Sequence, residues 1–297
     1  MTTPNGLLLI DKPQGLTSHD VVARVRRALK ERKVGHAGTL DPMATGLLVV
    51  AVGPATRLLR FAQGQDKVYT GTVRLGIATD SLDADGAVLD TQPVPTITSS
   101  EADAAAASLT GPIEQVPPMV SALKVNGKRL HELAREGIEV ERAPRAITIT
   151  DFSVSPTDDP AVWDFEVHCS VGTYVRVLLA DWAARLGTIG HLTALRRVSS
   201  GDHHVAEALS IEQLQERCEA GERVLAPALS FVGHLTTVTA SPEDLVRLRR
   251  GQLLMFVATE TTSEVAVVDG AGILAGIVHR RGDGWQPDLV FPEEQPC

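Results

Sequence analysis

The chain has 297 residues, of which 43% are hydrophobic and 22% are charged, and its formal net charge at pH 7 is -9. This composition allows a buried core, and no apolar run approaches the roughly 20 residues of a membrane span, which excludes a disordered chain and a helical membrane protein. Three widely spaced cysteines favour a reducing compartment, and the N-terminus lacks the regions of a signal peptide. We therefore expect a cytoplasmic protein with one large domain and a small appendage.

The N-terminal quarter of the chain alternates between apolar runs and helix signals. GLLLID (6–11) predicts a short buried strand that ends at the turn sequence DKPQG. Thr17 and Asp20 have the spacing of a capping box, and apolar residues at 22, 25 and 29 continue at helical spacing. A strand near 46–52, a short helix over 55–61 and a strand over 67–76 follow. Alternation in that last strand places Tyr69, Val73 and Leu75 on one face.

The rest of the chain divides into a polar segment, a second set of core elements and a β-rich end. An acidic loop and an alanine-rich helix precede a proline-marked stretch, which we expect to be a polar insertion over 111–145 with a helix around 127–137. Short strands on either side of a turn at Asp269 and Gly270 predict a β-rich module after residue 228. The other expected elements are the loop 79–86, helices 100–109, 173–187 and 210–218, and strands 146–152, 162–171 and 191–201.

One stretch, GHAGTLDPMATG (35–46), combines flexible residues with a single carboxylate, Asp41, directly before a proline. The pattern predicts a loop of fixed shape that presents this carboxylate. Residues 24–33, just before the stretch, carry six cations against the single anion Glu31. Local clustering of cationic side chains, rather than net charge, decides whether a protein binds nucleic acid. The basic helix is therefore compatible with an RNA or DNA partner despite the acidic net charge.

Several common kinds of site are missing from the sequence. It contains no dinucleotide-binding glycine motif after a strand, no P-loop and no serine-hydrolase elbow. The loop LDADG resembles a calcium loop, but Gln92 stands where a bidentate glutamate is required. His203 and His204 lie beside Asp202 without a matching ligand cluster. These exclusions leave a cofactor-free mechanism built on carboxylate, arginine and aromatic groups.

A set of motifs in a fixed order resembles the TruB-type tRNA pseudouridine synthases. The motifs cover roughly residues 6–200 and read LLLIDKPQGLTSHD, GHAGTLDPMATGLL, DKVYTGTVRLG, PPMVSALKVNGKRLHELAREG, GTYVRVLLADWAARLG and HLTALRRV. The resemblance implies an α+β pseudouridine synthase fold with a central mixed sheet and an active-site cleft. It also implies isomerisation of uridine 55 in the tRNA T loop, by base flipping, without cofactor, metal or ATP.

The resemblance assigns catalytic roles to Asp41, Arg176 and Tyr69. Asp41 matches the essential aspartate of the family, where an ordinary loop aspartate would only cap a turn. Arg176 matches the arginine that pairs with it and so offsets the cost of burying the carboxylate, the alternative being a surface ion pair. Tyr69 matches the tyrosine that stacks on the target base, the alternative being a core tyrosine.

Further positions carry substrate-binding expectations. Tyr174 and Leu195 correspond to residues that line the same pocket, and His36 to the residue that fills the space left by the flipped base. Lys12 is expected to support the active-site loop or to contact a phosphate. For Asp83, a contact with the active site and a solvated turn remain equal alternatives. Val120 departs from the family pattern, because an aromatic residue is common there.

The same resemblance suggests how RNA is held and how the chain is divided. The basic helix and the insertion, acting as a thumb, would grip the backbone of the tRNA T-arm electrostatically. Residues 1–228 would form the catalytic domain and residues 229–297 a PUA-like domain, in a monomer. Two rival hypotheses remain: an RNA-binding protein without chemistry, and a nucleoside or glycoside hydrolase with Asp41 as nucleophile, which would need a second carboxylate as acid.

Overall fold

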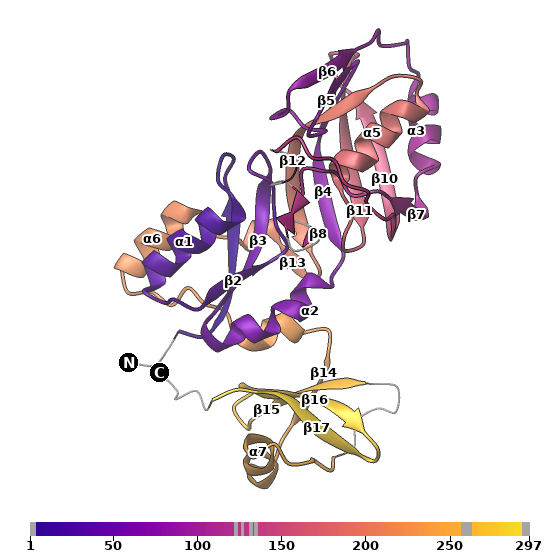
Figure 1. The fold of residues 1–297 in the computed structure, drawn as a ribbon. Helices are drawn as coiled ribbons and strands as arrows, with labels where there is room; N and C mark the ends of the chain where they lie inside the picture. The colour runs from indigo at the N-terminus through magenta and orange to yellow at the C-terminus, as the bar shows by residue number, and fades with distance from the viewer. Residues whose placement is uncertain are drawn as a thin grey trace.

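The computed structural model describes residues 4–121, 124–125, 128–130, 133, 136–256 and 263–292. At its centre is a mixed nine-stranded β-sheet (Figure 1). The order across the sheet is β1 (Gly6–Lys12), β3 (Thr45–Val52), β12 (Gly190–Ser200), β4 (Lys67–Leu75), β11 (Val162–Cys169), β10 (Arg145–Pro156) and β7 (Gly111–Gln115), with β2 (Val34–Ala37) on β3 and β13 (His203–His204) on β12.

Two parts of this sheet meet at one short parallel junction. Strand β3 pairs with β12 only through Thr45 opposite Arg196 and Gly46 opposite Arg197. The other described strand pairs of the sheet are antiparallel. The loop that contains Asp41 enters β3 at this junction. The loop therefore lies where the smaller part of the sheet, formed by β1, β2 and β3, joins the larger part.

Helices cover both parts of the sheet. On the larger part, α3 (Ser99–Ala107) and α5 (Val175–Arg185) pack against the sheet, and the Trp182 indole in their contact donates to the carbonyl of Ala102 at 3.1 Å. On the smaller part, α1 (Ser18–Leu29) and α6 (Ile211–Glu219) bury one face of β1 and β3. No helix in the described ranges is long and apolar enough to cross a membrane.

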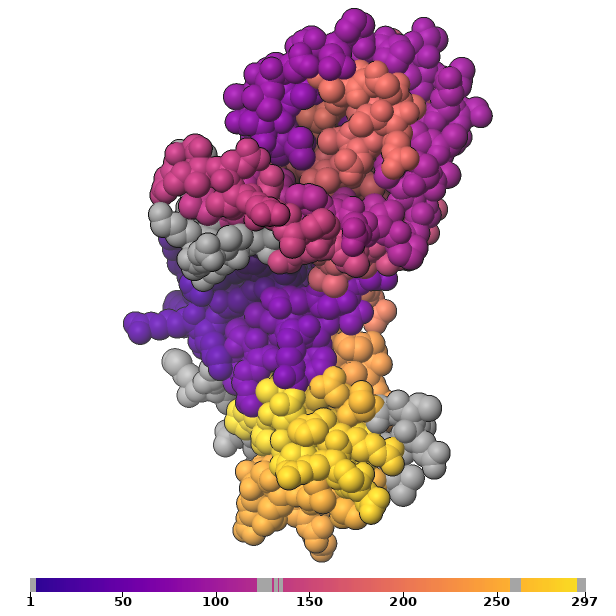
Figure 2. Space-filling model, turned by 45° about the vertical axis from the view of Figure 1, so that its right-hand side comes forward, coloured from indigo at the N-terminus to yellow at the C-terminus, as the bar shows by residue number. Residues whose placement is uncertain are grey.

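The opposite face of β1 and β3 is buried by three short helices and by the C-terminal module. The helices are η1 (Gly53–Leu58), α2 (Leu59–Gln63) and η3 (Ala228–Val232). The module is a four-stranded sheet with one helix, and Figure 2 shows it directly against the N-terminal part. Its elements are β14 (Thr236–Thr239), α7 (Pro242–Arg249), β15 (Glu264–Val268), β16 (Leu274–Arg281) and β17 (Gly284–Val290).

The module has a core of its own and also shares one with the rest of the chain. Leu248, Val265 and Val278 belong to a cluster inside the module. Ile277 and Leu289 point the other way, into the cluster that contains Leu7 and Phe231. Arg60 of α2 forms an ion pair with Asp288, which adds a polar contact at the rim of this interface. The module is thus packed against the larger domain through apolar side chains.

Most expected elements are confirmed, including the capping box of Thr17 and Asp20 on α1. Two expectations are wrong in detail. Residues 111–115 are not part of an insertion, because they form the edge strand β7 on β10. The helix expected over 55–61 is split between η1 and α2. The helix expected around 127–137 lies largely outside the described residues. Among the described residues of this region, β8 (Lys124–Val125) pairs with β9 (Lys128–Arg129).

The acidic segment 79–86 lies at one end of a small hairpin. Its strands are β5 (Ile77–Thr79) and β6 (Val88–Thr91), and the turn between them carries Asp83. An isolated bridge joins Asp83 to Leu192 of β12. This bridge holds the turn against β12 of the central sheet, so it is not a freely solvated loop.

Candidate active site

The loop between β2 and β3 is fixed by main-chain contacts on both sides of Asp41. The Ser18 hydroxyl donates to the carbonyl of Leu40 at 3.1 Å and accepts from its amide at 2.9 Å. On the other side, the Pro42 carbonyl accepts from the amide of Gly15 at 2.8 Å and from the Lys12 ammonium at 3.3 Å. The residues before and after Asp41 are therefore both tied to the start of the chain.

Lys12 is fully buried and donates to main-chain carbonyls. Besides Pro42, its ammonium reaches the carbonyls of Pro13 at 3.0 Å and Leu16 at 2.6 Å. Burial lowers its pKa to about 8, and Asp41 opposes that shift. Of the two roles expected for Lys12, support of the loop agrees with these contacts, whereas a buried ammonium with three carbonyl partners is not placed to meet a phosphate.

Gly46 allows the loop to enter β3 at the junction with β12. Its φ is +98°, and a Cβ there would lie 2.3 Å from the carbonyl oxygen of Arg197. Only glycine fits both the backbone conformation and this close approach. Steric constraints thus explain why the last residue of GHAGTLDPMATG is glycine.

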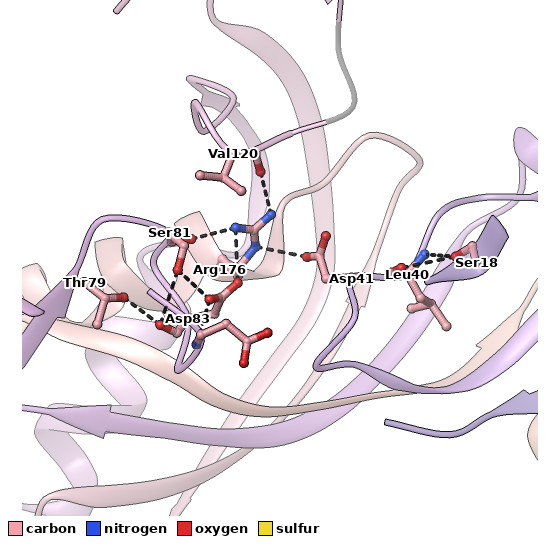
Figure 3. A network of polar contacts seen from close by, with 9 residues as sticks. Ser18, Leu40, Asp41, Thr79, Ser81, Asp83, Val120 and Arg176 are labelled. Atoms are coloured by element: carbon pink, nitrogen blue, oxygen red, sulfur yellow. Dashed lines mark hydrogen bonds and ion pairs between the residues drawn. The ribbon is translucent and has the colours of Figure 1, made fainter. Parts of the chain in front are cut away.

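Arg176 connects the carboxylate of Asp41 to the hairpin turn (Figure 3). Its Nε lies 3.1 Å from Asp41 Oδ2, and its Nη1 lies 3.3 Å from Asp83 Oδ2. The same guanidinium donates to the carbonyl of Ser81 at 2.6 Å and to that of Val120 at 2.9 Å. Every nitrogen of the guanidinium has a partner, so its orientation toward Asp41 is fixed.

The two carboxylates around Arg176 differ in exposure. The side chain of Asp83 is 6% exposed and accepts from the Ser81 hydroxyl, while the side chain of Asp41 is 37% exposed toward the cleft. Asp83 therefore contacts the active site, and the alternative of a solvated turn is wrong. Burial raises the pKa of Asp41 above its usual value, the Arg176 cation opposes this, and the Asp83 charge adds to it.

A cleft of about 790 Å³ opens in front of this ion pair. Its lining includes six of the residues predicted from sequence: His36, Asp41, Tyr69, Tyr174, Arg176 and Leu195. Tyr69 is 8% exposed, its ring lies between core and cleft, and burial raises the pKa of its phenol. Tyr174 precedes α5, so the helix start presents both Tyr174 and Arg176 to the same space.

His36 lies at the side of the cleft on β2. Its ring meets that of His19 edge to face, with 5.5 Å between the centroids. Burial lowers the pKa of His36, and the neighbouring His19 and Arg197 act in the same direction. The imidazole is thereby held as a neutral, flat ring at the cleft wall.

Sequence reasoning missed several residues that hold the site together. Gln115, on β7, accepts from the amide of Tyr174 at 2.9 Å and donates to its carbonyl at 3.3 Å. Arg197 is completely buried and bonds to the loop backbone. Ser18 holds Leu40 as described above. Their contact partners are distant in sequence, so no local pattern in the chain signals them.

Metal-ligating groups do not gather at this site. In the described ranges, no three histidine, cysteine, aspartate or glutamate side chains are arranged to hold an ion. The charged residues that line the cleft are instead Asp41, Lys67, Arg145, Arg176 and Arg197, with Lys12 beneath the loop. This arrangement can place a carboxylate beside a bound molecule and keep its charge balanced.

Comparison with solved structures shows which known proteins share this fold. A crystal structure of a Cbf5–Nop10–Gar1 complex matches with a TM-score of 0.73 at 22% identity, over 96% of this chain and 83% of that one. An H/ACA ribonucleoprotein bound to a substrate RNA that contains 2′-deoxyuridine gives 0.73 at 20% identity, over 97% and 85%. The architecture is that of the pseudouridine synthases, which are isomerases.

The sequence comparisons then give the family. Residues 26–175 match the model of the TruB family pseudouridylate synthase (N terminal domain). Relatives named tRNA pseudouridine synthase B are 41% identical in Streptococcus pneumoniae serotype 4, over 97% of this chain and 99% of the relative, and 42% identical in Arthrobacter sp. strain FB24, over 98% and 99%. The chain belongs to the TruB family of pseudouridylate synthases.

Proposed function

We propose that this protein isomerises uridine 55 in the T loop of tRNA to pseudouridine. The observation that carries the proposal is the Asp41 carboxylate, presented to a 790 Å³ cleft and paired at 3.1 Å with a buried arginine. The name shared by the relatives, tRNA pseudouridine synthase B, supports tRNA as the substrate.

The reaction needs no group beyond those at the cleft. The N1–C1′ glycosidic bond breaks, the uracil turns, and a C5–C1′ bond forms. The proton on C5 is released and N1 gains a proton, so atoms and charge balance. A carboxylate at this place suits three roles: attack on C1′, attack on the base, or removal of a C2′ proton. In each role it must be ionised, and Arg176 supplies the compensating cation.

The aromatic and apolar residues of the lining would hold the extruded base. In this proposal Tyr69 stacks on the uracil, and Tyr174 and Leu195 close the pocket around it. Extrusion costs a few kcal/mol of lost stacking and pairing. The neutral ring of His36 would fill the vacated stack, because its shape rather than its charge is what that role requires.

The remaining surface would grip RNA. Cations at the end of α1 and after it would meet the T-arm backbone, together with the insertion, which begins after β7 rather than at residue 111. Residues 229–297 would act as a PUA-like domain beside the catalytic domain of residues 1–228. We propose a monomer that works in the cytoplasm.

The decisive experiment is tritium release from tRNA transcripts labelled at uridine C5. The wild type should release tritium, and Asp41→Asn should not, while both bind the tRNA with similar affinity. If neither protein releases tritium although both bind, the proposed activity is wrong and an RNA-binding protein without chemistry is the better reading. Free uracil in place of pseudouridine would instead show a hydrolase.

A further inference from the structure

Arg197 is a buried cation that the chemistry proposed above does not use. It is 0% exposed, and within the described part of the chain no carboxylate forms an ion pair with it. Lys67, a charge of the same sign, lies near it: a Cβ placed on Gly38 would lie 3.4 Å from Arg197 Nη1 and 3.6 Å from Lys67 Cε, and burial and then the Arg197 charge lower the pKa of Lys67 to about 8. Burying an arginine in this way is costly, which indicates that its hydrogen bonds serve a purpose.

Those bonds reach both ends of the loop that carries Asp41. Arg197 Nη2 donates to the carbonyl of Gly38 at 3.2 Å, where the loop begins. Its Nε donates to the carbonyl of Leu47 at 2.7 Å, just after the loop has entered β3. One rigid group thereby sets the distance between the two ends of a nine-residue segment, 38–46, while Lys12 holds its middle at Pro42.

The same side chain reaches Tyr69. Arg197 stands opposite Tyr69 in the pairing of β12 with β4. Burial raises the pKa of the Tyr69 phenol, whereas the guanidinium of Arg197 beside it lowers that pKa. Tyr69 lies on β4 and Asp41 lies in the loop before β3, so another group must fix the position of the ring relative to the loop. A guanidinium can do this because its donors lie in one plane at fixed angles, whereas a lysine has a single nitrogen.

We propose that Arg197 is a positioning residue that holds the Asp41 loop and the Tyr69 ring at a fixed mutual distance, and so sets the rate of isomerisation without touching the base. The proposal rests on the proposed function of this site. It predicts that loss of the fork geometry slows the reaction at saturating enzyme and leaves RNA affinity nearly unchanged.

The test is single-turnover tritium release with enzyme in excess over C5-labelled tRNA. For Arg197→Lys we expect the maximal rate to fall at least 100-fold and the half-saturating enzyme concentration to change less than threefold. Arg196→Lys is the matched control, because Arg196 is the adjacent residue of β12 and pairs with Asp11 outside the cleft at 2.7 Å. It should stay within twofold of the wild type.

Two further measurements separate positioning from folding. In a double-mutant cycle, Arg197→Lys and Tyr69→Phe should together slow the rate less than the product of their single effects, because both break one contact. Hydrogen exchange should quicken over residues 38–46 in Arg197→Lys and stay unchanged in β10 and β11. In both measurements Arg197 is replaced by lysine, which keeps the charge.

Clear outcomes would overturn the inference. One is a maximal rate within threefold of the wild type; another is a loss confined to tRNA affinity. A third is a rate loss that matches the unfolded fraction seen by circular dichroism. If the wild type itself releases no tritium, the proposed function fails instead, so the two failures are distinguishable.

Discussion

Asp41 and Arg176 show how unequal burial prepares a reactive pair. The guanidinium is 4% exposed and bonded on every nitrogen, whereas the carboxylate is 37% exposed toward a cleft and has room for a bound molecule. The cleft offers less water than open solvent, so the pKa of Asp41 is raised even though a cation lies at 3.1 Å. Keeping the Asp41 carboxylate ionised therefore lowers the free energy of unfolding of the protein.

That cost leads to a prediction for Asp41→Asn. Because the folded-state pKa of Asp41 is raised, the fold releases this proton at higher pH than the unfolded chain, and the wild type loses stability as the pH rises through that interval. The asparagine does not titrate. At pH 7 the variant should therefore melt higher than the wild type, by roughly 1–3 °C, with a smaller difference near pH 4. Calorimetry at both pH values checks this, and a lower melting temperature at pH 7 would show that pairing with Arg176 outweighs desolvation.

The neighbours of Asp41 should shift the pH dependence of the reaction in opposite directions. Activity falls on the acid side as Asp41 takes up its proton. The charge of Asp83 raises the pKa of Asp41 and that of Lys12 lowers it. Asp83→Asn should therefore move the acid limb of the kcat/KM profile to lower pH, and Lys12→Met should move it to higher pH. Shifts in the same direction would contradict this electrostatic account.

At the scale of elements, the junction of β3 and β12 depends on one glycine. Gly46 has φ +98° and lies against the carbonyl of Arg197, with 2.3 Å between that oxygen and any added Cβ. An alanine would meet both backbone strain and a collision that no rotamer relieves. The strands would have to separate at the point where the Asp41 loop enters β3.

Gly46→Ala should therefore lower the free energy of unfolding by about 2–4 kcal/mol. Gly187→Ala is the control, because Gly187 has φ +74° but no atom near the added Cβ. It should cost only about 1–2 kcal/mol, the strain of the left-handed conformation alone. Urea unfolding of the three proteins measures the difference, and equal losses would show that the contact with Arg197 is unimportant.

The elements predicted correctly are those whose signal is local. The capping box on α1 and the apolar run of β3 lie within a few consecutive residues. Strand β7 was missed because Gly111, Pro112 and its alternating exposed residues read as a loop, yet a proline fits an edge strand with a single neighbour. The division of 55–61 was missed because Pro54 favours a helix start without deciding its type.

The candidate site divides in the same way. Motifs in the sequence pointed to Asp41, Arg176 and Tyr69, which the fold brings to one cleft. The supporting contacts link residues that are distant along the chain: Arg197 to Gly38 over 159 positions and Gln115 to Tyr174 over 59. The residues next to Arg197 and Gln115 in the sequence form no motif that would indicate these contacts, so the contacts become visible only in the folded structure.

At the scale of the whole molecule, the charge of one local surface is opposite in sign to the net charge of the chain. The chain carries a formal charge of -9, yet Arg27, Lys30 and Lys33 are exposed close together at the end of α1 and just after it. An anionic surface elsewhere limits indiscriminate RNA binding, whereas a local basic patch supports binding at one face.

Replacing Arg27, Lys30 and Lys33 together by glutamate should weaken tRNA binding and flatten its dependence on salt. Each lost phosphate contact should lower the slope of log Kd against log salt by about 0.7–0.9. Arg74→Glu is the control, because Arg74 is exposed at the end of β4 and pairs with Asp159. Filter binding over a salt series checks the slopes, and an unchanged slope would remove α1 from the RNA-binding surface.

The parallel pairing of β3 with β12 also determines when the protein becomes active during its synthesis. Residues 45 and 196 must meet before the sheet closes, and Arg176 and Arg197 reach the Asp41 loop only then. A nascent chain on the ribosome therefore leaves the edge of β3 open until about two thirds of the polypeptide has emerged. We therefore expect chains that end before β12 to be inactive and to leave the start of β3 unpaired, which favours aggregation.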